Sequence, residues 1–141
     1  IQWVKSKINE GIDLHEIIIL SRNVNDLKPF SRKLKENNIL CWELDASSNF
    51  LYNEVGLASV RRVKGLEYRC VAIVNCNEDQ FPLEKELAKI GDIKDEDDFL
   101  IKEINLLYVA MTRARDNLYI SYTNSPSMYL ETIENHYNKD V

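Results

Sequence analysis

Hydrophobic residues in the first part of the chain follow two different periods, which predict a helix and then a strand. From residue 1 to 10 they recur at helical spacing, with Val4 and Ile8 on one face, and Gly11 ends the predicted helix. Residues 16–20 instead contain an unbroken run of large aliphatic side chains. Such a run is typical of a strand that is buried on both faces of a parallel sheet.

A second helix and a second strand are predicted next. Asp26 is the expected N-cap, which would place Pro29 at the third helical position, where its missing N–H costs nothing. Asn37 and Asn38 can close this helix in a left-handed turn. Residues 39–44 then predict a short strand.

The middle of the chain predicts two further strands and an acidic connection. Residues 55–60 and 70–74 are apolar runs, separated by a turn that is rich in basic residues. From 84 to 98 the chain has seven acidic residues and three lysines. This composition predicts a surface loop, whose last acidic residues would favour the N-terminus of the following helix.

A long amphipathic helix is predicted to lead into and occupy most of the stretch from 103 to 121. Its apolar positions recur at steps of three and four residues: Leu100, Ile104, Leu107, Met111 and Ala114. The opposite side is also partly apolar, so the helix should be covered on two sides. The side chain of Arg113 is expected to project from the second of these covered faces. Asp116 and Asn117 are expected to stop the helix before a strand at 118–121. Ser125 and Pro126 can start a final helix to about residue 138.

Strands that alternate with helices predict one α/β domain over residues 1–141, with a mostly parallel central sheet. Ligands of such sheets gather beyond the carboxyl ends of the strands. Arg22 directly follows the first strand, and the loop at 61–67 follows another one. Taken alone, both features are more typical of a solvated surface.

The net charge of −5 argues against an autonomous nucleic-acid binder. The charge is uneven, however, because residues 84–98 alone contribute −4. Elsewhere Arg61, Arg62, Lys64 and Arg69 cluster within nine residues, so a local basic site remains.

The cysteines do not suggest a metal or disulfide framework. Cys41, Cys70 and Cys76 are odd in number and lack C-x-x-C spacing, and only His15 and His136 could join them. We therefore expect no metal site. Reduced thiols favour a cytoplasmic protein.

Residues 106–116, read as Leu-Leu-Tyr-Val-Ala-Met-Thr-Arg-Ala-Arg-Asp, closely resemble motif VI of the UvrD/Rep-like superfamily 1 DNA helicases. In that family the arginine after the threonine reaches the γ-phosphate of ATP. The resemblance therefore implies a catalytic and ATP-binding role for Arg113. The alternative is that Arg113 and Arg115 only complement the dipole of a last helical turn.

Two further segments resemble motifs of the same family, in the same order. The unit strand–Arg22–helix–strand is similar to motif IV, whose arginine also approaches the γ-phosphate, so Arg22 is expected to be catalytic and to bind ATP. Residues 64–68, Lys-Gly-Leu-Glu-Tyr, resemble motif V, which usually has Phe in place of Tyr68. The resemblance implies nucleotide contacts for Gly65 and Glu67.

The other side of motif V touches single-stranded DNA in the family, which implies DNA contacts for Ser59, Arg61 and Lys64. The family commonly has Thr-x-His where this chain has Ser59-Val60-Arg61, so the hydroxyl is kept and a permanent cation replaces an imidazole. The alternative is a plain basic turn in which Glu67 pairs with Lys64 or Arg69.

The resemblance implies a RecA-like three-layer domain, the second motor domain (2A) of an ATP-dependent DNA helicase, without a 2B insertion. The chain has no G-x-x-x-x-G-K-[ST] loop, so ATP with Mg²⁺ would be held by a separate N-terminal P-loop domain. The isolated domain should then be inactive. The competing interpretations are a degenerate helicase-like module that binds a partner protein, and a stand-alone phosphate-binding domain.

Overall fold

The computed structural model describes residues 1–44 and 53–131 of the chain. Five strands form one sheet in the order β2-β3-β1-β4-β5, and every neighbouring pair is parallel. The strands are β1 (Ile17–Ser21), β2 (Cys41–Glu43), β3 (Val55–Ser59), β4 (Tyr68–Ile73) and β5 (Ala114–Ile120). The predicted α/β class with a parallel sheet is confirmed.

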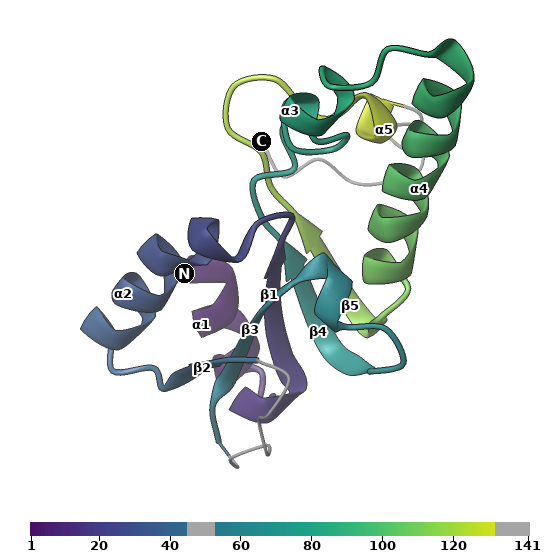
Figure 1. Cartoon of the computed structure of the whole chain (residues 1–141). Coiled ribbons are helices and arrows are strands. Elements are labelled where there is room, and N and C mark those ends of the chain that lie inside the picture. Colours follow the sequence, from purple (N-terminus) through teal and green to yellow (C-terminus); the bar gives the residue numbers. More distant parts are fainter. Residues whose placement is uncertain (45–52, 132–141) are drawn as a thin grey trace.

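Helices cover both faces of this sheet, so the domain has three layers (Figure 1). One face carries α1 (Gln2–Asn9) and α2 (Lys28–Glu36), and the other carries α4 (Ile93–Met111). The central strand β1 is fully buried, because its alternate residues enter two different cores. Ile17 and Ile19 pack under α1 and α2, whereas Ile18 and Leu20 pack towards α4.

The first helix ends as predicted, but the second one begins differently. Gly11 follows α1 with φ +84°, and Asn38 follows α2 with φ +57°, the left-handed conformation expected there. The N-cap prediction for Asp26 is wrong. The side chain of Asn23 accepts from the backbone N–H of Asn25 and caps a 3₁₀ turn at Val24–Leu27, and α2 continues from it with Pro29 in its first turn.

The acidic segment is largely helical and not a loop. It contains the single turn α3 (Glu84–Leu87) and the start of α4. Asp92 caps α4 by accepting from the N–H of Lys94 at 2.8 Å, with Asp95 and Glu96 in the first turn. The last acidic residues of the segment therefore lie at the N-terminus of the helix, as predicted, where they favour it. The helix begins earlier along the chain than predicted.

Helix α4 also ends earlier than predicted, at Met111, and β5 starts at Ala114. Pairing with β4 decides this boundary, since the N–H of Tyr68 donates to the carbonyl of Arg113 at 2.9 Å. Asp116 and Asn117 therefore lie within the strand and do not stop the helix. The predicted stripe is shifted as well: Ile104 is 42% exposed, and the face turned to the sheet carries Glu103, Leu107 and Ala110.

The C-terminal helix is described only in its first turn, α5 (Met128–Glu131). The rest of the helix predicted up to residue 138, and most of the connection at 45–54, lie outside the described residues. Within the described ranges no helix is both long and apolar enough to cross a lipid bilayer.

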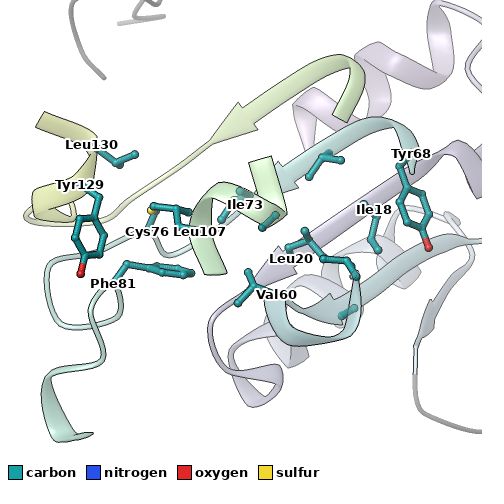
Figure 2. Packing of buried hydrophobic residues seen from close by; sticks show 14 residues of the cluster. Ile18, Leu20, Val60, Tyr68, Ile73, Cys76, Phe81, Leu107, Tyr129 and Leu130 are labelled. Carbon is teal, nitrogen blue, oxygen red and sulfur yellow. The ribbon is translucent and has the colours of Figure 1, made fainter. Parts of the chain in front are cut away.

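Tyr68 lies in the core on the α4 side of the sheet with Ile18 and Leu20 (Figure 2). It is 5% exposed, and its Oη is the only buried side-chain polar atom of the described residues without a hydrogen-bond partner. Burial raises the pKa of Tyr68 to about 12. A desolvated hydroxyl without a partner costs about 1–3 kcal/mol.

We therefore expect Tyr68→Phe to raise the free energy of unfolding by roughly 1 kcal/mol in urea titrations. Tyr129→Phe is the control, because Tyr129 Oη donates to the carbonyl of Leu100 at 3.1 Å and its loss should destabilise the domain. The advantage of the Tyr68→Phe variant should grow between pH 10 and about 12, because the raised pKa makes the folded wild type lose stability there. Equal destabilisation by both variants would contradict this account.

Candidate functional site

The expected site residues lie on both ends of the parallel strands. Ser21 of β1 and Ser59 of β3 are aligned in register, so Arg22 and the start of the basic loop lie together at the carboxyl edge of the sheet. Because β3 and β4 are parallel, residues 60–67 must return along the sheet to the amino edge, where β4 begins. This crossover packs against α4 through the buried side chains of Val60 and Val63.

At the carboxyl edge Arg22 is bound to Glu103 of α4. Arg22 Nε donates to Glu103 Oε2 at 2.9 Å, and Nη2 donates to Oε1 at 2.7 Å, which makes a bidentate pair. Both side chains are almost completely buried, with 4% and 2% of their surfaces exposed. Glu103 Oε2 also accepts from the N–H of Leu83, at 3.2 Å. One carboxylate therefore joins β1, α4 and the segment that follows β4.

The basic loop presents its cations to solvent. Arg61 and Arg62 lie in a 3₁₀ turn, Lys64 follows, and all three are exposed and make no ion pair with a described residue. Gly65 has φ +81°, a conformation that side chains other than glycine's rarely tolerate. Glu67 is also exposed and pairs with neither Lys64 nor Arg69.

Arg113 lies at the amino edge, in the turn between α4 and β5, and not on the helix as predicted. Its side chain folds back over the last helical turn. Nε donates to the carbonyl of Val109 at 3.1 Å, Nη1 to the carbonyl of Leu66 at 3.2 Å, and Nη2 to Thr112 Oγ1 at 3.3 Å. A guanidinium has five N–H groups, so one on each terminal nitrogen has no acceptor among the described residues.

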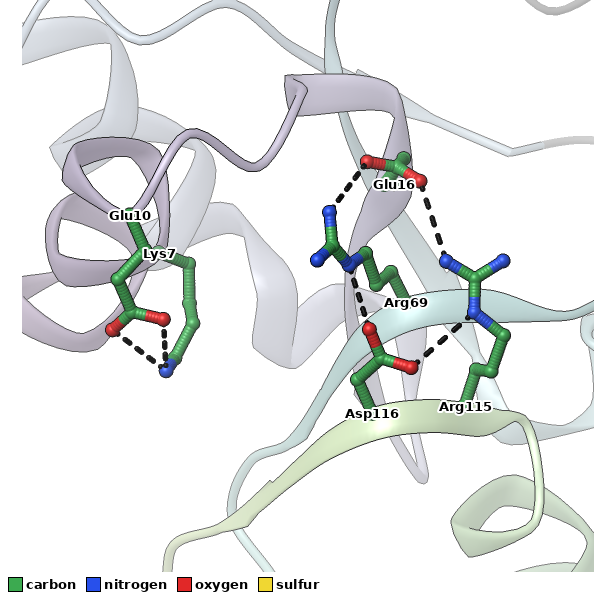
Figure 3. A network of polar contacts seen from close by, with 6 residues as sticks. All are labelled: Lys7, Glu10, Glu16, Arg69, Arg115 and Asp116. Carbon is green, nitrogen blue, oxygen red and sulfur yellow. Dashed lines mark hydrogen bonds and ion pairs between the residues drawn. The ribbon is translucent and has the colours of Figure 1, made fainter.

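Two other arginines are neutralised by acidic partners (Figure 3). Arg69 contacts Asp116 at 2.6 Å and Glu16 at 3.7 Å, and Arg115 contacts the same two acids at 3.3 and 3.7 Å. The hydrogen bond from Arg69 lowers the pKa of Asp116. Arg69 therefore does not belong with the cations of the basic loop, contrary to the expected cluster.

The expected residues thus form two groups. Arg22, Ser59 and Arg61 lie at or next to the carboxyl edge, and Gly65 and Glu67 lie near Arg113 at the amino edge, with Lys64 on the crossover between them. From Glu103 to the end of α4 the helix rises about 12 Å, so the structure does not bring Arg22 and Arg113 together.

A role for Glu103 was not predicted from the sequence. Its spacing could have revealed it. Glu103 lies four residues before Leu107 and seven before Ala110, which places an acidic residue on the apolar face of a helix. Because a buried carboxylate needs a partner, that pattern indicates an arginine or a lysine on the element it packs against.

Cys70 and Cys76 are buried and Cys41 is partly buried. Burial raises the pKa of Cys76 to about 12. Within the part of the chain that the structure describes, no three His, Cys, Asp or Glu side chains are grouped so that they could hold a metal ion.

A family model described as the UvrD-like helicase C-terminal domain matches residues 42–125. The chain belongs to this family, as the resemblance of motifs V and VI predicts.

The similar curated proteins are much longer than this chain. It is 32% identical over 127 residues to the Bacillus subtilis (strain 168) protein YjcD, named as a candidate ATP-dependent DNA helicase, and the match covers 85% of the chain. It is 37% identical over 78 residues, 55% of the chain, to the ATP-dependent DNA helicase PcrA of Staphylococcus aureus. These matches cover 16% and 10% of the two relatives.

A solved structure has the same fold. It is the C-terminal domain of a possible DNA helicase from Lactobacillus plantarum WCFS1, with a TM-score of 0.64 and 21% sequence identity. The similarity covers 92% of this chain and 67% of that one.

Because Arg22 and Glu103 form a buried ion pair, we expect replacing one of them to lower the free energy of unfolding much more than replacing both. Arg22→Ala leaves a buried carboxylate without its cation and should cost about 3–5 kcal/mol of unfolding free energy. The double variant Arg22→Met with Glu103→Met removes both charges and should lie much closer to the wild type. Urea unfolding of the domain measures both. A double variant as unstable as Arg22→Ala would show that the pair is not the cause.

Proposed function

We propose that this chain is the second motor domain of an ATP-dependent DNA helicase or translocase, and that it acts with a P-loop domain of the same protein. The proposal rests first on Arg113, which has two N–H groups without an acceptor among the described residues and is bonded to the loop that contains Gly65 and Glu67. The family membership of the chain supports the same function.

The nucleotide side consists of Arg113, Gly65 and Glu67. The two remaining N–H groups of Arg113 suit two oxygens of the γ-phosphate. Gly65 has no side chain, so a phosphate can approach the backbone there. The Glu67 carboxylate would repel phosphate, so any contact that it makes with the nucleotide would be with hydroxyl groups of the sugar. ATP and Mg²⁺ would be held by the P-loop domain, so the isolated domain would be inactive.

Arg22 is proposed as the second arginine that reaches the γ-phosphate. About 12 Å of helix separate its partner Glu103 from the end of α4, so Arg22 and Arg113 would approach the nucleotide from different ends of the sheet.

The DNA side consists of Ser59, Arg61 and Lys64. The exposed cations and the hydroxyl suit successive phosphates of a single strand, without reading its bases. The crossover at 60–67 connects this side to the nucleotide side, so closure on ATP would move the loop along the strand.

A second candidate is a module that binds a partner protein. It is favoured by exposed apolar side chains on the outer face of α4, where Ile101 is 57% and Tyr108 is 64% exposed. A P-loop upstream in the gene distinguishes the motor from this alternative, because only the motor requires one.

In the full-length protein we expect Arg113→Ala to lower kcat for ATP hydrolysis by roughly 10²-fold or more, because the lost charge acts mainly on the transition state. Arg113→Lys should restore little, since an ammonium lacks the planar fork. Arg115→Ala is the matched control, because Arg115 is 59% exposed and paired with acids. Titration of the ATPase rate with ATP measures all three. Near-normal turnover of Arg113→Ala would contradict the assignment.

In the same protein, Arg61→Ala and Lys64→Ala should each weaken single-stranded DNA binding for all sequences alike. Each should flatten the dependence of log K on log salt by about 0.7, the loss of one phosphate contact. Arg69→Ala is the control, since its charge is already paired. Fluorescence anisotropy at several salt concentrations gives the slopes. Unchanged slopes in both loop variants would show that the loop does not contact DNA.

A further inference from the structure

A cleft of about 290 Å³ lies between helix α2 and the edge of the sheet formed by β2 and β3. Its lining includes Glu43 of β2 and Leu57 of β3 on the sheet side, and Lys28, Arg32 and Lys35 on the helix side. Leu57 is 2% exposed, whereas Glu43 and the three cations are exposed. The charged groups of this cleft are therefore accessible to a ligand.

The three cations of α2 form one row along the helix. They follow each other at steps of four and three residues, which places them on the same face, and from Lys28 to Lys35 the helix rises about 10 Å. None of them makes an ion pair with a described residue, although Glu43 lines the same cleft. Three cations and one carboxylate give the cleft a charge of +2, in a chain whose net charge is −5. A row of unpaired cations suits a ligand that carries several anionic groups in succession.

The cleft adjoins the proposed DNA side of the domain. Successive side chains of a strand point to opposite faces of the sheet, so Ser59 points to the same face as Leu57, which is the face covered by α2. The two residues are about 7 Å apart along β3, and Ser59 is partly exposed at the carboxyl end of the strand. Helix α2 begins at this same edge, because it follows β1 through a 3₁₀ turn. A row of phosphates that contacts Ser59 can thus continue into the cleft, where Lys28 is the first cation.

We propose that the cleft between α2 and the β2–β3 edge binds backbone phosphates of single-stranded nucleic acid and extends the track beyond the basic loop. This inference rests on the proposed function, which assigns Ser59, Arg61 and Lys64 to the DNA. The position beside Ser59 favours nucleic acid over an acidic protein segment, which would need the cations alone. Contacts of this kind are blind to the base sequence and sensitive to salt.

The test measures binding of a fluorescent oligothymidylate to the full-length protein at several salt concentrations. One variant removes the positive charges of the cleft by Lys28→Gln, Arg32→Gln and Lys35→Gln. Glutamine is a long side chain with good helix propensity, so the fold should be retained. The dependence of log K on log salt should flatten by about 2, because each lost phosphate contact accounts for about 0.7.

A matched control removes the same amount of charge from exposed positions outside the cleft, by Lys33→Gln, Lys94→Gln and Lys102→Gln. Its slope should change by less than about 0.7, since no phosphate contact is lost. Glu43→Gln should act in the opposite sense and tighten binding, because it removes a negative charge that repels phosphate. If the cations of α2 only faced solvent, the two triple variants would bind alike and Glu43→Gln would have no effect.

Arg61→Ala and Lys64→Ala, measured beside these variants, test the proposed DNA side by itself. Normal binding by both would contradict that side. Weakened binding by both, together with a cleft variant that behaves like its matched control, would overturn the cleft proposal alone. A cleft variant that binds the oligothymidylate normally but has lost affinity for polyglutamate would assign the cleft to an acidic protein segment and overturn the proposal as well.

Discussion

The buried ion pair between Arg22 and Glu103 is the contact on which the arrangement of the domain depends. A parallel sheet must be covered on both faces, and α4 provides most of the cover on one of them. The pair fixes this helix to the end of the central strand, and Leu83 adds the segment after β4. Two desolvated charges are tolerated only when they are paired and hydrogen-bonded, and because this pair joins three elements, a change of either residue affects all three.

Under the proposed function, the crossover from β3 to β4 would connect the nucleotide side of the domain to its DNA side. Its start lies beside Arg22, and its end is bonded to Arg113 through the carbonyl of Leu66. Val60 and Val63 hold its middle against the core, whereas its cations remain exposed. The turn after α4 and the proposed DNA side are thus joined by eight residues of backbone.

The sequence was sufficient to predict the buried strands, because β1 and β4 consist mainly of apolar residues, as in strands that are covered on both faces of a sheet. It was insufficient at the end of α4, where Ala114 continues the helical spacing but lies in a strand that pairs with β4, a contact that local periodicity does not contain. The motif singled out Arg113 by its place in the family pattern but did not predict its place in a turn. The apolar face of α4 indicated that Glu103 needs a cation but not which one, since 81 residues separate Arg22 from Glu103.

The central claim is that this domain supplies one half of an ATPase site. The most direct test compares ATP hydrolysis by the pure 141-residue domain and by the full-length protein, with and without single-stranded DNA. Circular dichroism confirms that the isolated domain is folded. The account predicts DNA-stimulated hydrolysis by the full-length protein and none by the domain. DNA-stimulated turnover by the domain alone would contradict it.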